Sequence, residues 1–275
     1  MLSRRDFLKL SAAGTAALYA STRARFLRRV GAAQSPQVPL AGAAIPKFVE
    51  KLPQLADLGV VDATAGTGPL GTSQIVLNMT EFQAQVLPGT FYAALPAPYN
   101  AGTYVWGYLQ SWQTGRSTYL GPIILAKRNS PVEMKFVNNL GNTDGLTPTN
   151  VLAYKYGTDQ TLHWADPLNG EANMWNHMAM PPAPGTEGAE NYLGPIPACV
   201  HLHGGEVPPV LDGGPDAWVT SDGLYQGHAF YSADGALATN YHTYRYPNSQ
   251  EGSPIWFHDH TLGATRLNVY AGLAG

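Results

Sequence analysis

The sequence predicts an all-β protein, built as a sandwich or barrel of short strands. The chain has 275 residues with 30 glycines, 22 prolines and 15 tyrosines, and only 13% of its residues are charged. Glycine and proline interrupt helices and mark turns, whereas tyrosine is enriched in strands. Apolar and aromatic runs of about four to eight residues recur between these turn residues, which is typical of a layered β protein.

Residues 1–33 have the composition of an export signal. Ser3-Arg4-Arg5-Asp6-Phe7-Leu8-Lys9 is a twin-arginine motif, and the mildly apolar stretch 10–20 follows it. That stretch is too short for a transmembrane helix, so we expect a signal helix and no stable membrane span. We expect the twin-arginine translocase as export partner, and a periplasmic or extracellular mature protein. The alternative is a basic helix that binds nucleic acid or a membrane.

Without this signal the protein would be acidic. Residues 1–33 carry seven Lys or Arg and one Asp, so their removal takes the net charge from −3 to −9. A negative surface repels the phosphate backbone, and we therefore expect no nucleic acid among the partners.

The first half of the remaining chain is predicted to hold an extension and then strands. Residues 34–73 are rich in Ala, Gly and Pro, with one possible helix at 48–55, and we expect an extension that lies over the domain. The domain is expected to begin at residue 74. Strands are predicted where β-branched and aromatic residues stand between turn residues, at 74–86, 104–109, 123–128 and 132–140.

Residues 141–197 are too long for an ordinary connection, so they are a functional loop or loosely ordered. They contain a methionine group that either binds Cu(I) through its thioethers or covers apolar surface. That group consists of Met174, Met178 and Met180.

Two later runs each contain His-x-His. His201-Leu202-His203 lies in the run 198–205, where Gly204-Gly205 follows it, and His258-Asp259-His260 ends the run 255–260. Side chains alternate along a strand, so the two histidines of each pair point the same way. Neutral imidazole is the commonest ligand of zinc, copper and iron, and we therefore predict a metal site, although this spacing alone does not choose the metal. The other histidines carry no ligand signal: His163, His177, His228 and His242.

The single cysteine, Cys199, excludes a disulfide within the chain. It is expected to share a strand face with His201 and His203, which makes a sulfur ligand conceivable. We favour a buried, inert thiol. Beyond the first pair, residues 206–222 form a loop, residues 241–246 a strand and residues 261–270 a short helix, and Leu273 opens another strand.

Several short motifs follow one another as in a known family. They are Val105-Trp106-Gly107-Tyr108, Gly121-Pro122, Lys127-Arg128-Asn129, Val137-Asn138-Asn139-Leu140, His201-Leu202-His203-Gly204-Gly205, Tyr246-Pro247-Asn248, Trp256-Phe257-His258-Asp259-His260 and Thr265-Arg266-Leu267-Asn268-Val269-Tyr270-Ala271-Gly272-Leu273. Together they resemble the multicopper oxidases, in particular the bacterial spore-coat laccase and bilirubin-oxidase-like branch. The resemblance spans about residues 45–275 and covers only the first of the family's three cupredoxin domains. It implies a cupredoxin-like Greek-key β-sandwich over 74–275, incomplete at its C-terminal end.

The resemblance also implies a ligand set. His201 would bind the type 2 copper of a trinuclear cluster, and His203, His258 and His260 would bind its type 3 pair. The cluster would be shared with a C-terminal domain that this sequence lacks. The type 1 copper needs a His-Cys-His run, and the chain has none. The family places an acidic residue near the type 2 copper for proton management, here Asp212, for which a turn-capping carboxylate is the alternative.

The activity implied is that of a laccase, with O2 as acceptor and a small reducing substrate: a phenol, a bilirubin-like compound or a metal ion. We expect this chain alone to be inactive, and the coding sequence to continue past Gly275 towards a His-Cys-His run. One alternative is a non-catalytic copper-binding cupredoxin. Another is a mononuclear enzyme of the cupin kind, although Glu206 lies too close to His203 for the glutamate of a cupin.

Overall fold

The computed structural model describes residues 41–66, 74–141, 164–167 and 194–275. The predicted signal at 1–33, the start of the extension and most of the predicted loop lie outside these residues. So do His163, His177 and the methionine group. Within the described part of the chain, no helix is long and apolar enough to cross a membrane.

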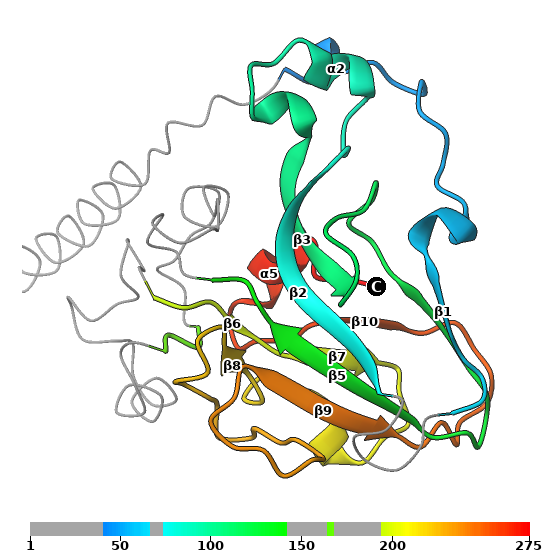
Figure 1. Ribbon diagram of the computed structural model, residues 1–275, viewed down its shortest axis with the longest axis vertical. Helices are drawn as coiled ribbons and strands as arrows, with labels where there is room; N and C mark the ends of the chain where they lie inside the picture. The colour runs from blue at the N-terminus through cyan, green and yellow to red at the C-terminus, as the bar shows by residue number, and fades with distance from the viewer. Residues whose placement is uncertain (1–40, 67–73, 142–163, 168–193) are drawn as a thin grey trace, which may run out of the picture. The chain divides into compact units, whose positions relative to one another are not determined.

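The largest sheet contains four strands in the order β3-β2-β5-β9 (Figure 1). β2 pairs antiparallel with β3 and parallel with β5, and β5 pairs antiparallel with β9. The sequence predicts all four strands to within two residues at each end, because turn residues bound each apolar run. Their bounds are Ile75–Ala84 for β2, Thr103–Gln110 for β3, Val132–Asn138 for β5 and Tyr241–Tyr246 for β9.

Two short strand pairs pack against this sheet and make a second layer. β7 (Val200–His203) pairs antiparallel with β10 (Trp256–Asp259), and β6 (Pro197–Ala198) pairs antiparallel with β8 (Val219–Thr220). Both pairs share one buried cluster of apolar residues with the four-stranded sheet. The predicted all-β sandwich is therefore confirmed.

Aromatic residues fill the space between the layers. The ring of Phe257 on β10 lies 5.0 Å from that of Tyr108 on β3 and 6.1 Å from that of Phe136 on β5, measured between centroids. Val200 on β7 is fully buried beside them. Because side chains alternate along a strand, this inward anchoring turns the histidines of β7 and β10 outward.

The extension differs from the prediction. The helix predicted at 48–55 is wrong: residues 48–54 are not helical, and a 3-10 turn occupies Leu55–Leu58. Pro53 disfavours helical geometry at the residue before it, and the Gln54 N–H donates to the Asp57 carboxylate at 2.7 Å to start the turn one residue after the proline. The strand β1 (Val60–Ala63), which was not predicted, then pairs parallel with β4 (Ile123–Ala126).

The remaining elements are short. The helix α2 (Gly89–Ala93) was not predicted, and α5 (Thr265–Ala271) begins four residues later than expected. Three further 3-10 turns occupy Gly42–Ala44, Tyr99–Ala101 and Pro209–Leu211. After α5 the chain pairs with β10, since the Asp259 N–H donates to the Leu273 carbonyl at 3.1 Å. In place of the strand predicted to open at Leu273, the described residues form an isolated antiparallel bridge between Ala274 and His258.

Candidate metal centre

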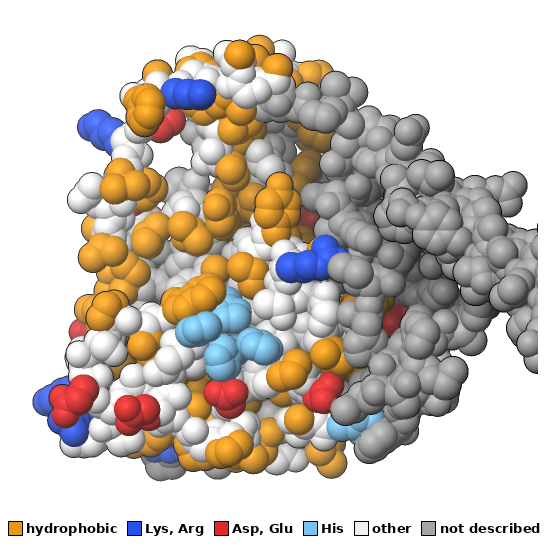
Figure 2. All heavy atoms as spheres, turned by 180° about the vertical axis from the view of Figure 1, so that it is seen from behind, with side chains coloured by type: hydrophobic (Ala, Val, Ile, Leu, Met, Phe, Trp, Pro, Cys, Tyr) orange, Lys and Arg blue, Asp and Glu red, His pale blue; other side chains and the backbone are white. Residues whose placement is uncertain are grey.

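The pairing of β7 with β10 brings the two His-x-His runs together. In this antiparallel register His201 lies opposite His258, and His203 lies opposite Trp256. The side chains of the two pairs therefore project from one face of the strand pair. Figure 2 shows the histidines gathered on one face of the molecule, with hydrophobic side chains beside them.

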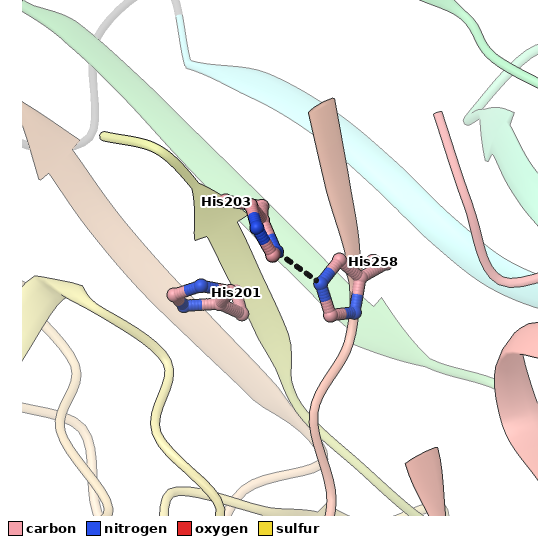
Figure 3. A group of neighbouring side chains, drawn as sticks. All are labelled: His201, His203 and His258. Atoms are coloured by element: carbon pink, nitrogen blue, oxygen red, sulfur yellow. Dashed lines mark hydrogen bonds between the residues drawn. The ribbon is translucent and has the colours of Figure 1, made fainter. Parts of the chain in front are cut away.

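Three of the four imidazoles already have the spacing of a ligand set. One nitrogen each from His201, His203 and His258 lies within 4.8 Å of the others. The closest approach is 3.0 Å, between Nδ1 of His203 and Nε2 of His258 (Figure 3). His260 joins them, with its ring centroid 4.9 Å from that of His201 and 5.7 Å from that of His258. The structure thus places all four predicted ligands at one site.

Main-chain carbonyls orient two of these rings. Nδ1 of His201 donates to the carbonyl of Asp212 at 2.6 Å, and Nδ1 of His258 donates to the carbonyl of Asp259 at 2.7 Å. A carbonyl oxygen only accepts, so both rings carry their proton on Nδ1. Nε2 of each ring is then left for a metal, an arrangement common among metal-binding histidines. The sequence could not reveal these acceptors, because every residue has a carbonyl.

The electrostatics of the site favour neutral imidazole. Burial lowers the pKa of His258, and the neighbouring His201, His260 and His203 lower it further. His258 is therefore neutral at pH 7, which is the form that binds metal ions. Convergent imidazole nitrogens fit zinc or copper, and the group of His201, His203 and His258 includes no thiol.

Asp212 lies beside this group. Its carboxylate Oδ1 is 3.5 Å from Nδ1 of His201, and its side chain is 44% exposed. The residue follows the 3-10 turn Pro209–Leu211, whose end is capped by the Asp212 main-chain N–H. The cap therefore uses the backbone of Asp212 and leaves its carboxylate near the site.

Cys199 does not lie on the histidine face, contrary to the expectation from alternation. The strand is interrupted at this residue, between β6 and β7. Its Sγ lies 3.4 Å from the carbonyl oxygen of Gly214, and the side chain is fully buried. Burial raises the pKa of the thiol, which disfavours the thiolate that a metal would need. The buried, inert thiol is the interpretation that fits.

Two further residues lie at the site, although nothing in the sequence alone marks them as site residues. The carboxylate of Asp259 is buried behind the histidines and accepts hydrogen bonds from both runs. Trp256 lies on the histidine face, next to two of the rings. His242 belongs to β9 and is fully buried, and His228 lies on the loop between β8 and β9.

Comparison with known proteins supports the export signal and identifies relatives of the chain. Residues 1–18 match the family model of the twin-arginine translocation pathway signal sequence, which indicates export across a membrane. The chain is 33% identical over 173 residues to a laccase of Bacillus subtilis, covering 63% of this chain and 24% of the laccase. It is 31% identical over 277 residues to a laccase of Haloferax volcanii, covering 99% of this chain and 35% of the laccase.

The chain thus spans about a quarter to a third of the length of these relatives. The crystal structure of a multi-copper oxidase from Pediococcus acidilactici aligns with 88% of this chain and 31% of its own, at 18% identity and a TM-score of 0.41. That likeness is too weak to add to the fold assignment. The chain is thus similar in sequence to part of the length of these laccases.

Proposed function

We propose that this chain supplies four histidine ligands to the trinuclear copper cluster of a laccase-like multicopper oxidase. The observation that carries the proposal is the convergence of His201, His203, His258 and His260 on the β7–β10 pair. The similarity to laccases supports copper over other metals. The remaining ligands and the type 1 copper would come from sequence beyond this chain.

The roles follow the resemblance. His201 would bind the type 2 copper through Nε2, because Nδ1 donates to Asp212. His203, His258 and His260 would bind the type 3 pair. Bound copper would supply the transfer of electrons from a small reducing substrate to O2, which becomes water. The substrate would be a phenol, a bilirubin-like compound or a metal ion.

The protein's own groups would prepare this site. The Asp212 and Asp259 carbonyls hold two rings through Nδ1, so little ordering of these rings would be required when metal binds through Nε2. The half-exposed Asp212 carboxylate would exchange protons between solvent and the site, a role supported by its closeness to His201. The mature protein would act in the periplasm or outside the cell, after export.

Copper titration followed by electron paramagnetic resonance tests the proposal. The expected result is Cu²⁺ binding to the chain with a nitrogen-ligand spectrum, weakened strongly by His201→Ala. The matched control is His228→Ala, an exposed histidine on the β8–β9 loop, which should bind as the unmodified chain does. The chain alone should oxidise no phenolic substrate, because it holds only part of the ligand set. Unchanged binding by His201→Ala would contradict the proposed site. Tight binding with turnover by the chain alone would favour a self-contained metal enzyme.

A further inference from the structure

Trp256 contacts two of the candidate ligands at once. It stands opposite His203 in the β7–β10 register and two residues before His258 on the same strand. The centroid of its ring system lies 4.2 Å from that of His258 and 5.0 Å from that of His203, and each imidazole is tilted by 31° from the indole plane. One indole therefore lies against the faces of two imidazoles.

The side chain of Trp256 is not part of the hydrophobic core. The neighbouring Phe257 turns inward and packs with Tyr108 and Phe136, whereas Trp256 faces outward with 43% of its surface exposed. Its removal should therefore leave the packing between the two layers intact.

The three clustered histidines are not held equally well. His201 and His258 are each tethered through Nδ1 to a main-chain carbonyl. His203 is exposed, and its Nδ1 donates a hydrogen bond to Nε2 of His258, the atom that would bind metal. A metal between these two nitrogens would replace that bond. The ring of His203 would then keep its contacts with Trp256 at 5.0 Å, His258 at 5.3 Å and His201 at 5.4 Å, and of these three neighbours Trp256 is the one that is not itself a candidate ligand.

We propose that Trp256 is a positioning residue of the metal centre. Its ring fixes the imidazole planes of His203 and His258 so that Nδ1 of one and Nε2 of the other face the same point. It acts through these ligands and does not itself bind the metal. This inference rests on the proposed copper site and adds a residue that orients its ligands.

Substitutions of Trp256 in the 275-residue chain test the role. Trp256→Leu removes the aromatic face and should weaken Cu²⁺ binding by about 2- to 10-fold, the size of one aromatic contact. Trp256→Phe keeps a ring and should restore most of the affinity. Trp112→Leu is the matched control, because it removes a more exposed tryptophan whose indole N–H donates to Gln110. Circular dichroism establishes that each variant is folded.

Fluorescence gives a second readout, which reports whether the indole of Trp256 lies close to the bound copper. Bound Cu²⁺ quenches nearby indole emission, so copper should quench the unmodified chain and Trp112→Phe by similar amounts. Trp256→Phe should lose most of this quenching. Equal quenching with and without Trp256, or equal affinity for Trp256→Leu and the unmodified chain, would overturn the inference.

A failure of the proposed function would look different. If His203→Ala and His258→Ala bind copper as the unmodified chain does, the copper site itself is wrong, and the role of Trp256 falls with it. If both variants lose copper and Trp256→Leu does not, the site stands and only the positioning role is wrong.

Discussion

The carboxylate of Asp259 accepts the main-chain N–H of Cys199 at 3.0 Å, and this bond ties the two histidine runs together. Asp259 stands between His258 and His260, while Cys199 lies two residues before His201. The same carboxylate accepts the N–H and the hydroxyl of Thr261, at 3.0 and 2.9 Å. A side chain on the face opposite the histidines thus holds the backbone from which they project.

Asp259→Asn should therefore destabilise the protein and weaken copper binding at the proposed site. The side-chain NH2 group of asparagine would face N–H and O–H donors and could not accept their hydrogen bonds. An unsatisfied buried polar group costs about 1–3 kcal/mol. Urea unfolding should show the loss of stability, and copper titration should show lower affinity. Asp62→Asn is the control, since that exposed carboxylate accepts two hydrogen bonds from Thr64 far from the histidines in sequence. Unfolding midpoints that fall equally in both variants would contradict this role.

The stability of the fold should fall in acid because of His242. This imidazole is fully buried on β9 and stacks on Tyr244, and burial lowers its pKa from 6.5 to about 4. Below pH 6.5 this histidine is protonated in the unfolded chain, whereas in the folded chain it stays neutral until about pH 4. The stabilisation is therefore complete above pH 6.5, and about 3 kcal/mol is lost as the pH falls to about 4.

His242→Phe keeps a stacked ring without the titrating group. The difference in unfolding free energy between this variant and the unmodified chain should shift by about 3 kcal/mol between pH 7 and pH 4, in favour of the variant at low pH. Urea unfolding at both pH values measures it. Parallel pH dependence of the two proteins would show that His242 is not responsible.

Gly213→Ala should disturb the site through the backbone. Gly213 has a positive φ of +66°, and an added Cβ would overlap the carbonyl oxygen of Val200. Its loop would have to move, which would draw the Asp212 carbonyl away from His201. We expect a loss of about 1–3 kcal/mol in stability and weaker copper binding. The next residue provides the control: Gly214→Ala has open space around the new methyl group and should change neither quantity.

Export should depend on the paired arginines of the signal. Replacing Arg4 and Arg5 by lysine keeps the charge but removes the guanidinium groups of the motif, and the protein should remain in the cytoplasm. Replacing Arg28 and Arg29 by lysine is the matched control, because these residues lie outside the matched signal at 1–18. Cell fractionation with immunoblotting measures both, and undiminished export of the first variant would refute the dependence.

The sequence predicts the structure correctly where neighbouring residues determine it. Alternation along one strand is enough to place His201 with His203, and turn residues are enough to bound β9. Prediction from the sequence fails where residues far apart along the chain determine the structure. β1 exists because β4 offers it a partner, and the interruption at Cys199 reflects contacts with Gly213, Gly214 and Asp259.

The orientation of the site was also beyond local reasoning. The carbonyls of Asp212 and Asp259 depend on how the chain turns and not on which side chains it carries. The position of Trp256 over His203 follows from strand register, which no spacing within one run encodes. The two His-x-His runs predict the four candidate ligands, whereas the groups that orient them are visible in the structure alone.

The separation of the two runs along the chain has a consequence for assembly. His203 and His258 are 55 residues apart, so the site forms only after the chain between them has closed into a loop and β7 has paired with β10. Copper added to the denatured chain meets two independent pairs that can each capture an ion separately. Copper added after folding meets four rings together and, by favouring the native state, would raise the melting temperature. The order of addition during refolding should therefore decide how much correctly loaded protein is recovered.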